Sequence, residues 1–182
     1  MSIVVLDAME NDNGMPEIIK HALRKMGKDI SHFRLKDLNI LPCRSCGACG
    51  FKSPGKCVAM DDTHDIFKAA AKCSLLVMIT PIRFGGYSSC LKKALDKIGN
   101  FCLPSYTVKY GHLLHPPRYG NKSILGIGVI EVNSKDREES FKRLVENNAL
   151  NLQYRHKALV FETAADKGKI KHEIECAVRE VC

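Results

Sequence analysis

Long hydrophobic runs are absent from this sequence of 182 residues. Its longest apolar stretch, Ile124 to Ile130, is far shorter than the roughly 18 residues that a membrane-spanning helix needs. The first residues also lack the basic segment with which a secretory signal peptide opens. We therefore expect a cytoplasmic protein that makes no contact with a membrane.

Runs of like charge are missing too, as is the aromatic and basic pattern of an RNA-binding sheet. Lys and Arg outnumber Asp and Glu by 28 to 20, which gives a net charge of +8, but the basic residues are scattered along the whole chain. A solvated basic surface is the simplest interpretation, and an anionic cofactor or an acidic protein partner also fits. We expect no nucleic-acid partner.

Strand-like and helix-like segments alternate along the chain. The helical segments, recognised by apolar positions three and four apart, follow the strands at about residues 17–26, 61–72, 90–98, 134 onward and 167 onward. The apolar and β-branched runs typical of strands lie at residues 2–7, 31–35, 74–80, 124–131 and 157–163. Alternation of this kind predicts a flavodoxin-like three-layer α/β/α fold around a five-stranded parallel sheet of order 2-1-3-4-5. We expect a single domain over residues 1–182, with a cysteine-rich loop inserted at about residues 42–60.

Cysteine is concentrated in that loop, in the pattern C-x2-C-x2-C-x7-C. The candidate metal ligands are Cys43, Cys46, Cys49 and Cys57. Four such thiolates hold an iron-sulfur cluster, and the small residues between them let the backbone curl around it. Structural zinc is the alternative, although it more often uses two separated cysteine pairs, and unligated thiols are a third interpretation.

Charge in the loop favours a cluster. From Leu38 to Met60 there is no acidic residue, whereas Arg44, Lys52 and Lys56 are present. A [4Fe-4S] centre with four thiolate ligands carries net negative charge, and these basic residues suit it.

The cysteine-rich loop and the residues after it resemble the iron-sulfur flavoproteins of the NAD(P)H-dependent FMN reductase superfamily. The similar segments are Pro42-Cys43-x-x-Cys46-Gly47-x-Cys49, Gly55-Lys56-Cys57-Val58 and Asp61-Asp62. The similarity continues through Thr80 to Gly86, which looks like that family's strand-to-helix loop around the flavin ring. The resemblance implies an oxidoreductase or electron-transfer protein that uses FMN and a [4Fe-4S] cluster, with no catalytic nucleophile. It also implies a nicotinamide nucleotide or an organic acceptor as redox partner, and a homo-oligomer. The basic net charge adds an acidic redox partner such as a ferredoxin.

The residues themselves support a flavin at this loop. Ligands of open α/β sheets bind outside the carboxyl ends of central strands, and glycines there let the backbone approach a planar ring. A helix entry turn without a ligand is the alternative. Arg83 would stabilise an anionic reduced flavin, hold a nicotinamide phosphate or pair with a surface carboxylate. The candidate ring contacts are Pro81, Ile82, Arg83, Phe84, Gly85, Gly86 and Asn133.

The loop after the first strand, where the family binds the flavin phosphate, is acidic. Its carboxylates, Asp7, Glu10 and Asp12, would repel a phosphate. The candidate phosphate donors are Asn11, Asn13 and Gly14. This loop supports an alternative function, a non-enzymatic flavodoxin-like binding module with a structural zinc or cluster and a lost flavin site.

Overall fold

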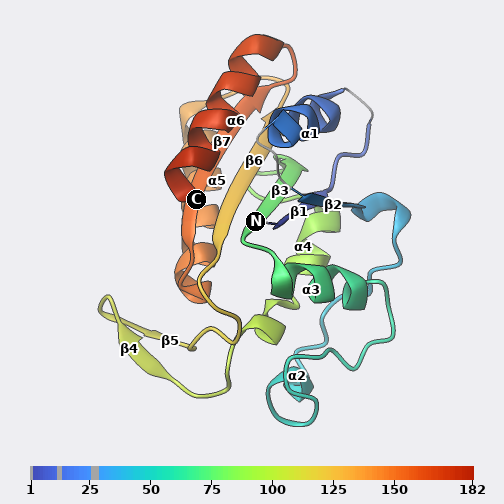
Figure 1. Ribbon diagram of the computed structural model, residues 1–182, viewed down its shortest axis with the longest axis vertical. Helices are drawn as coiled ribbons and strands as arrows, with labels where there is room; N and C mark the ends of the chain where they lie inside the picture. Colours follow the sequence, from blue (N-terminus) through green and yellow to red (C-terminus); the bar gives the residue numbers. More distant parts are fainter. Residues whose placement is uncertain (1, 12–13, 26–28) are drawn as a thin grey trace.

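A parallel sheet forms the centre of the structure, a computed structural model that describes residues 2–11, 14–25 and 29–182. All strand pairings in the five-stranded sheet are parallel, and its order is β2-β1-β3-β6-β7 (Figure 1). The strands are β1 (Ser2–Asp7), β2 (Asp29–Arg34), β3 (Leu75–Pro81), β6 (Ser123–Ile130) and β7 (Arg155–Glu162). Numbered among themselves, these strands have the order 2-1-3-4-5, so the predicted flavodoxin-like fold is confirmed.

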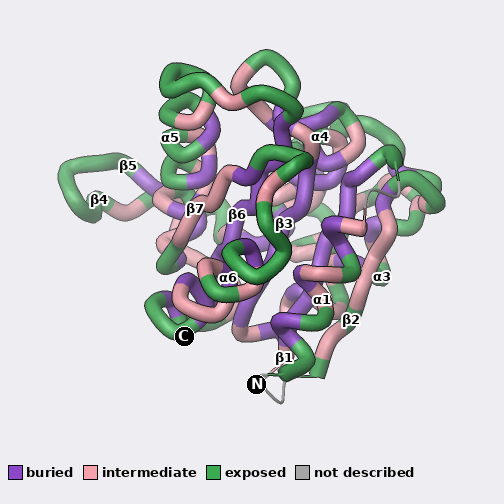
Figure 2. Tube along the Cα trace, turned by 90° about the horizontal axis from the view of Figure 1, so that it is seen from above, coloured by how far each residue is buried: buried purple, intermediate pink, exposed green. Residues whose placement is uncertain are grey.

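Helices cover both faces of the sheet and bury its apolar side chains. The helices α1 (Met15–Lys25) and α6 (Lys167–Val181) pack against one face, where Ile3 and Val5 point. The opposite face, where Val4 and Leu6 point, is covered by α3 (Thr63–Lys72), α4 (Ser89–Leu95) and α5 (Lys135–Leu152). Alternate side chains of β1 thus belong to two separate hydrophobic cores, one on each face of the sheet. The central strands are buried between these cores (Figure 2).

Short elements occupy the loops at the ends of the sheet. They are η1 (Leu35–Asp37), α2 (Ala48–Phe51), η2 (Ile98–Phe101), β4 (Thr107–Lys109) and β5 (His112–Leu114). Strands β4 and β5 form an antiparallel hairpin that projects from the body of the molecule and is mostly exposed (Figures 1 and 2). The segment of residues 101–121 between η2 and β6 therefore carries ordered structure of its own.

The predicted boundaries agree with the observed ones to within a few residues. Asp62 occupies the N-cap of α3, but its side chain makes no capping bond. The carboxylate of Asp61 instead accepts a hydrogen bond from the backbone N–H of Thr63 (3.1 Å). The predicted end of the first helix, at Met26 and Gly27, lies outside the described residues.

Two glycines in β6 allow close packing beside the carboxyl edge of the sheet. A Cβ atom on Gly126 would lie 2.5 Å from Cγ2 of Val145 in α5, and one on Gly128 would lie 2.7 Å from Cδ1 of Ile82. Only glycine leaves room for these neighbours, so β6 brings α5 and the loop after β3 together. None of the helices in the described part of the chain combines the length and the apolar composition needed to cross a bilayer.

Candidate functional site

The carboxyl ends of the central strands open onto a cavity of about 480 Å³. Its walls come from the segments that follow β1, β3, β6 and β7 and from the first turn of α5. The lining residues are Met9, Glu10, Asn11, Pro81, Ile82, Arg83, Val129, Ile130, Glu131, Val132, Arg137 and Thr163. A cavity of a few hundred Å³ at this edge of an open α/β sheet has the size and position of a small-molecule site.

Two carboxylates of the first loop, Asp7 and Glu10, have partners in the structure, and Asp12 is outside the described residues. Asp7 is 2% exposed, and its carboxylate accepts the backbone N–H of Met9 (3.0 Å) and lies 3.1 Å from Nε2 of His32. Glu10 receives a hydrogen bond from Nη2 of Arg83 (3.1 Å). Because Arg83 offsets the charge of Glu10 and Asp7 is buried, these two residues repel an anion less than the sequence suggests.

Arg83 therefore pairs with a surface carboxylate, one of the three roles considered for it. Both side chains of the pair are more than half exposed, at 56% for Arg83 and 55% for Glu10. An exposed pair of this kind stabilises a protein by about 1 kcal/mol at most, so an anionic ligand in the cavity competes easily for the guanidinium.

A tight turn follows β3 and leaves the Phe84 side chain exposed. Arg83 and Gly86 exchange two backbone hydrogen bonds of 3.0 and 2.9 Å, and both residues between them have positive φ, 51° at Phe84 and 76° at Gly85. This geometry is that of a type I′ turn, which favours glycine. A Cβ atom on Gly85 would also lie 3.1 Å from Cβ of Ser140, so the turn and the contact with α5 already account for this glycine.

The structure brings only some of the predicted flavin contacts together. Asn11, Pro81, Ile82 and Arg83 line the cavity. The residues described outside its lining are Gly14, Phe84, Gly85, Gly86 and Asn133. Asn133 is engaged elsewhere: its backbone N–H donates to Glu162 (3.0 Å) and its amide donates to Glu138 (2.7 Å). Asn13 lies outside the described residues.

Sequence reasoning missed the second guanidinium of the cavity. Arg137 lies in the first turn of α5, and its backbone N–H donates to the N-cap side chain of Ser134 (3.4 Å). The Ser134 cap was visible in the sequence, and counting one turn onward from it would have placed Arg137 at the carboxyl edge of the sheet.

A second cavity, of about 590 Å³, lies in the cysteine-rich loop between η1 and α3. All four predicted ligands line it: Cys43, Cys46, Cys49 and Cys57. Sulfur Sγ of Cys43 accepts the backbone N–H of Ser45, and Sγ of Cys57 accepts that of Ala59, both at 3.4 Å. Backbone N–H groups directed at cysteine sulfur are typical of clusters held by thiolates.

The thiols of this cavity influence one another. Burial raises the pKa of Cys49, and the negative charges of Cys43, Cys57 and Cys46 in their thiolate forms raise it further. Within residues 2–11, 14–25 and 29–182, no three Cys, His, Asp or Glu side chains are arranged so that they hold a single metal ion as they stand. In a [4Fe-4S] cluster each thiolate binds a different iron atom, so that arrangement does not need the four sulfur atoms to converge on one point.

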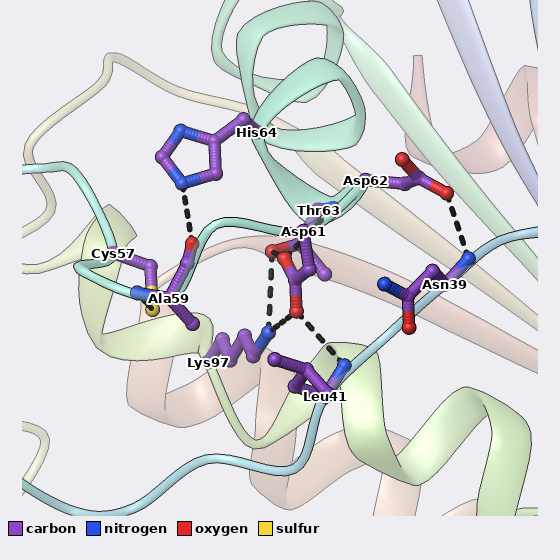
Figure 3. Close-up of polar contacts among 9 residues, drawn as sticks. All are labelled: Asn39, Leu41, Cys57, Ala59, Asp61, Asp62, Thr63, His64 and Lys97. Atoms are coloured by element: carbon purple, nitrogen blue, oxygen red, sulfur yellow. Dashed lines mark hydrogen bonds and ion pairs between the residues drawn. The ribbon is translucent and has the colours of Figure 1, made fainter.

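The two ends of the cysteine-rich loop are joined at its base (Figure 3). The Asp62 carboxylate accepts the backbone N–H of Asn39 (2.7 Å), and Asp61 accepts that of Leu41 (2.8 Å). Asp61 also forms a salt bridge with Lys97, whose side chain is 1% exposed, while that of Asp61 is fully buried. We call these contacts of Asp61 and Asp62 the loop clamp.

The charge of Asp61 depends on these partners. Burial alone would raise the pKa of its carboxyl group, but hydrogen bonds from Lys97, Thr63 and the backbone of Leu41 outweigh burial and hold the pKa below its usual value. Asp61 is therefore ionised at neutral pH, and the loop clamp contains a buried ion pair.

Two further residues of the cysteine cavity come from a distant part of the sequence. Lys97 lies just before η2 and Asn100 lies within it, and both residues line the cavity. They are separated from the cysteines by the whole of α3, β3 and α4, and no local sequence signal connects them with the thiols.

The comparison with known proteins decides the family. Residues 1–123, more than half of the chain, match the family described as NADPH-dependent FMN reductase. The chain belongs to this family.

Members named iron-sulfur flavoproteins are similar to parts of the chain. One, from Methanocaldococcus jannaschii, is 31% identical over 77 residues, covering 42% of this chain and 39% of that protein. Another, from Archaeoglobus fulgidus, is 28% identical over 92 residues, covering 48% of this chain and 44% of that protein. The matched segments thus span less than half the length of either relative.

Solved structures confirm the family fold. An NAD(P)H:quinone oxidoreductase from Methanothermobacter marburgensis superposes with a TM-score of 0.73 at 12% identity, covering all of this chain and 99% of that one. An FMN-dependent NADH-azoreductase from Bacillus anthracis gives a TM-score of 0.66 at 12% identity, with both chains fully covered. At such identities the likeness concerns the fold alone.

Proposed function

We propose that this protein is a flavin-dependent oxidoreductase that binds FMN at the carboxyl edge of its sheet and a [4Fe-4S] cluster in the cysteine cavity. The observation that carries the proposal is the cavity at the ends of β1, β3 and β6, in a chain of the FMN reductase family. When bound, FMN exchanges two electrons with a nicotinamide nucleotide or an organic acceptor, and the cluster exchanges single electrons.

The residues of the first cavity fit FMN. Arg83 and Arg137 offer two guanidinium groups to an anionic ligand, and Asn11 adds an amide at the first loop. Ile82, Val129 and Ile130 provide apolar walls that exclude water from a flat ring. We propose Asn11, Pro81, Ile82 and Arg83 as the flavin contacts in this cavity. The other predicted contacts stay predictions: Gly14, Phe84, Gly85, Gly86 and Asn133, which are outside its lining, and Asn13, which is outside the described residues.

The residues of the second cavity fit a cluster. Four thiols of one loop line a common space, and the loop clamp holds both ends of that loop. Backbone N–H groups already point at two of the sulfur atoms. We assign Cys43, Cys46, Cys49 and Cys57 as the ligands, with structural zinc as the competing occupant.

The proposed protein partner is an acidic one-electron carrier of the ferredoxin type, and a groove beside the cysteine cavity supports this part of the proposal. The groove has a volume of about 430 Å³ and shares Cys57 with the cysteine cavity. Lys56, Lys68 and Lys72 line it and are exposed. An acidic partner bound there would lie close to one of the four thiols, and such docking weakens as salt concentration rises.

A homo-oligomer is the last part of the proposal. The β4–β5 hairpin exposes apolar side chains, with Val108 at 75%, Tyr110 at 71% and Leu113 at 66%. Exposed apolar side chains on a projecting element are typical of a contact between subunits. Light scattering coupled to gel filtration measures the number of chains, and a monomer would contradict this part alone.

The decisive experiment is anaerobic purification followed by a visible spectrum and assays of flavin, iron, sulfide and zinc on one sample. The proposal predicts flavin and iron-sulfur absorption, and oxidation of NADPH or NADH when an acceptor is added. A colourless protein that contains zinc and no flavin would contradict it and would favour the non-enzymatic binding module.

A further inference from the structure

Asn100 has a buried side chain whose hydrogen-bonding groups are not used. The residue is 1% exposed, and neither Nδ2 nor Oδ1 has a hydrogen-bond partner among the described residues. Leaving such a group unpaired in a protein interior is destabilising, and native structures contain few examples. Asn100 is among the residues that line the cysteine cavity, and it also lines the neighbouring groove of Lys56, Lys68 and Lys72.

The position of Asn100 is well determined by its neighbours. Its backbone N–H donates to the carbonyl oxygen of Lys97 (3.1 Å), and the side chain of Lys97 is held by Asp61 and Thr63 in the loop clamp. Between them lies Gly99, where an added Cβ atom would be 3.5 Å from Sγ of Cys49. The backbone at Gly99 therefore lies against one of the four thiols, next to Asn100 in the chain.

The chemistry of an amide suits a sulfur-rich anion. Nδ2 carries two N–H donors, and both thiolate and inorganic sulfide accept hydrogen bonds. Reduction of a cluster adds negative charge, so a donor at one of its sulfur atoms stabilises the reduced form more than the oxidised form.

We propose that Asn100 contacts the bound cluster, donating a hydrogen bond from Nδ2 to one of its sulfur atoms. This contact raises the reduction potential of the cluster and slows the release of iron. The inference rests on the proposed [4Fe-4S] occupant of the cysteine cavity.

The test compares Asn100→Leu with Asn147→Leu in anaerobically prepared holoprotein. Leucine has a similar size but no donor, and Asn147 is exposed on α5, which contributes no residue to the lining of the cysteine cavity. N100L should shift the cluster midpoint potential to a more negative value in a redox titration followed by absorption. It should also release iron to a chelator about fivefold faster, as expected for the loss of one hydrogen bond. N147L should match the wild type in both measurements.

The outcomes separate this inference from the proposed function. Wild-type protein without iron and sulfide would overturn the cluster and this inference together. A wild type with the cluster, and an N100L variant with unchanged potential and iron release, would overturn the role of Asn100 alone.

A melting experiment on cluster-free protein excludes a purely structural role. Leucine removes two unsatisfied polar atoms, so cluster-free N100L should melt no lower than cluster-free wild type. A clearly lower melting temperature would show that Asn100 supports the fold itself, and would overturn the inference.

Discussion

Replacing Asp61 with asparagine tests the loop clamp most directly. The substitution keeps the shape of the side chain and one oxygen acceptor, but it removes the negative charge opposite Lys97. Because the Lys97 side chain is 1% exposed, its ammonium group would remain buried without a charged partner, next to Thr63 Oγ1 (3.3 Å) and at most a neutral amide oxygen. Breaking a buried ion pair from one side costs about 3–5 kcal/mol.

Urea unfolding measures this cost. With a slope of about 2 kcal/mol per molar urea, a loss of about 3 kcal/mol lowers the unfolding midpoint by about 1.5 M. Asp62→Asn is the matched control, since Asp62 is exposed and its side chain accepts only the Asn39 N–H in the described structure. D62N should lose no more than about 1 kcal/mol.

A double variant separates the charge from the contact. D61N combined with Lys97→Met removes both charges, and it should recover at least half of the stability that D61N loses. A D61N protein as stable as D62N would refute the reasoning, because the pair would then contribute nothing that depends on burial.

The pH dependence has a definite sign. Folding holds the pKa of Asp61 below its usual value of 3.8, so its ionised form stabilises the fold fully above about pH 4. This contribution is lost as the pH falls through the lower pKa of the folded state. The stability difference between wild type and D61N should therefore shrink in acid and stay constant from about pH 5 to 7.

Three further predictions concern the carboxyl edge of the sheet. Gly126→Ala should destabilise the fold by about 1–3 kcal/mol in urea unfolding, because its Cβ atom would lie 2.5 Å from Val145. Gly120→Ala, with open space around it, should be neutral, and equal effects of the two variants would contradict the packing argument. Gly85→Ala should lower the free energy of unfolding by about 1–2 kcal/mol, because φ at this residue is +76°. Gly86→Ala should lower it clearly less, and the reverse order would rule out the turn as the cause. In a titration followed by quenching of flavin fluorescence, Arg83→Ala should weaken FMN binding several-fold and Glu10→Gln should strengthen it. Changes of the same sign would show that Glu10 does not compete for Arg83.

The fold was predictable because its signals are local. The period of the apolar residues distinguishes Ser2–Asp7 from the helical pattern that follows, and the alternation of such segments leaves few topologies. The hairpin at β4 and β5 was not predictable, since strands of three residues on an exposed loop carry too little pattern.

The candidate sites were predictable in part. The four cysteines identify their own cavity because they are close in the chain, and a short loop keeps them together whatever surrounds it. In the cavity at the carboxyl edge of the sheet, Pro81 to Arg83 follow from their place after a buried strand, but Arg137 depends on where α5 packs.

The sequence by itself determined the order of strands and helices, the cysteine-rich loop and the position of a ligand site after the central strands, since each depends on residues adjacent in the chain. Only the tertiary structure decided which charges are compensated. It pairs Glu10 with Arg83 and Asp61 with Lys97, and it brings Asn100 into the lining of the cavity that the four cysteines share. Pairings across such separations depend on how whole elements pack, and packing is a property of the folded chain that no local pattern contains.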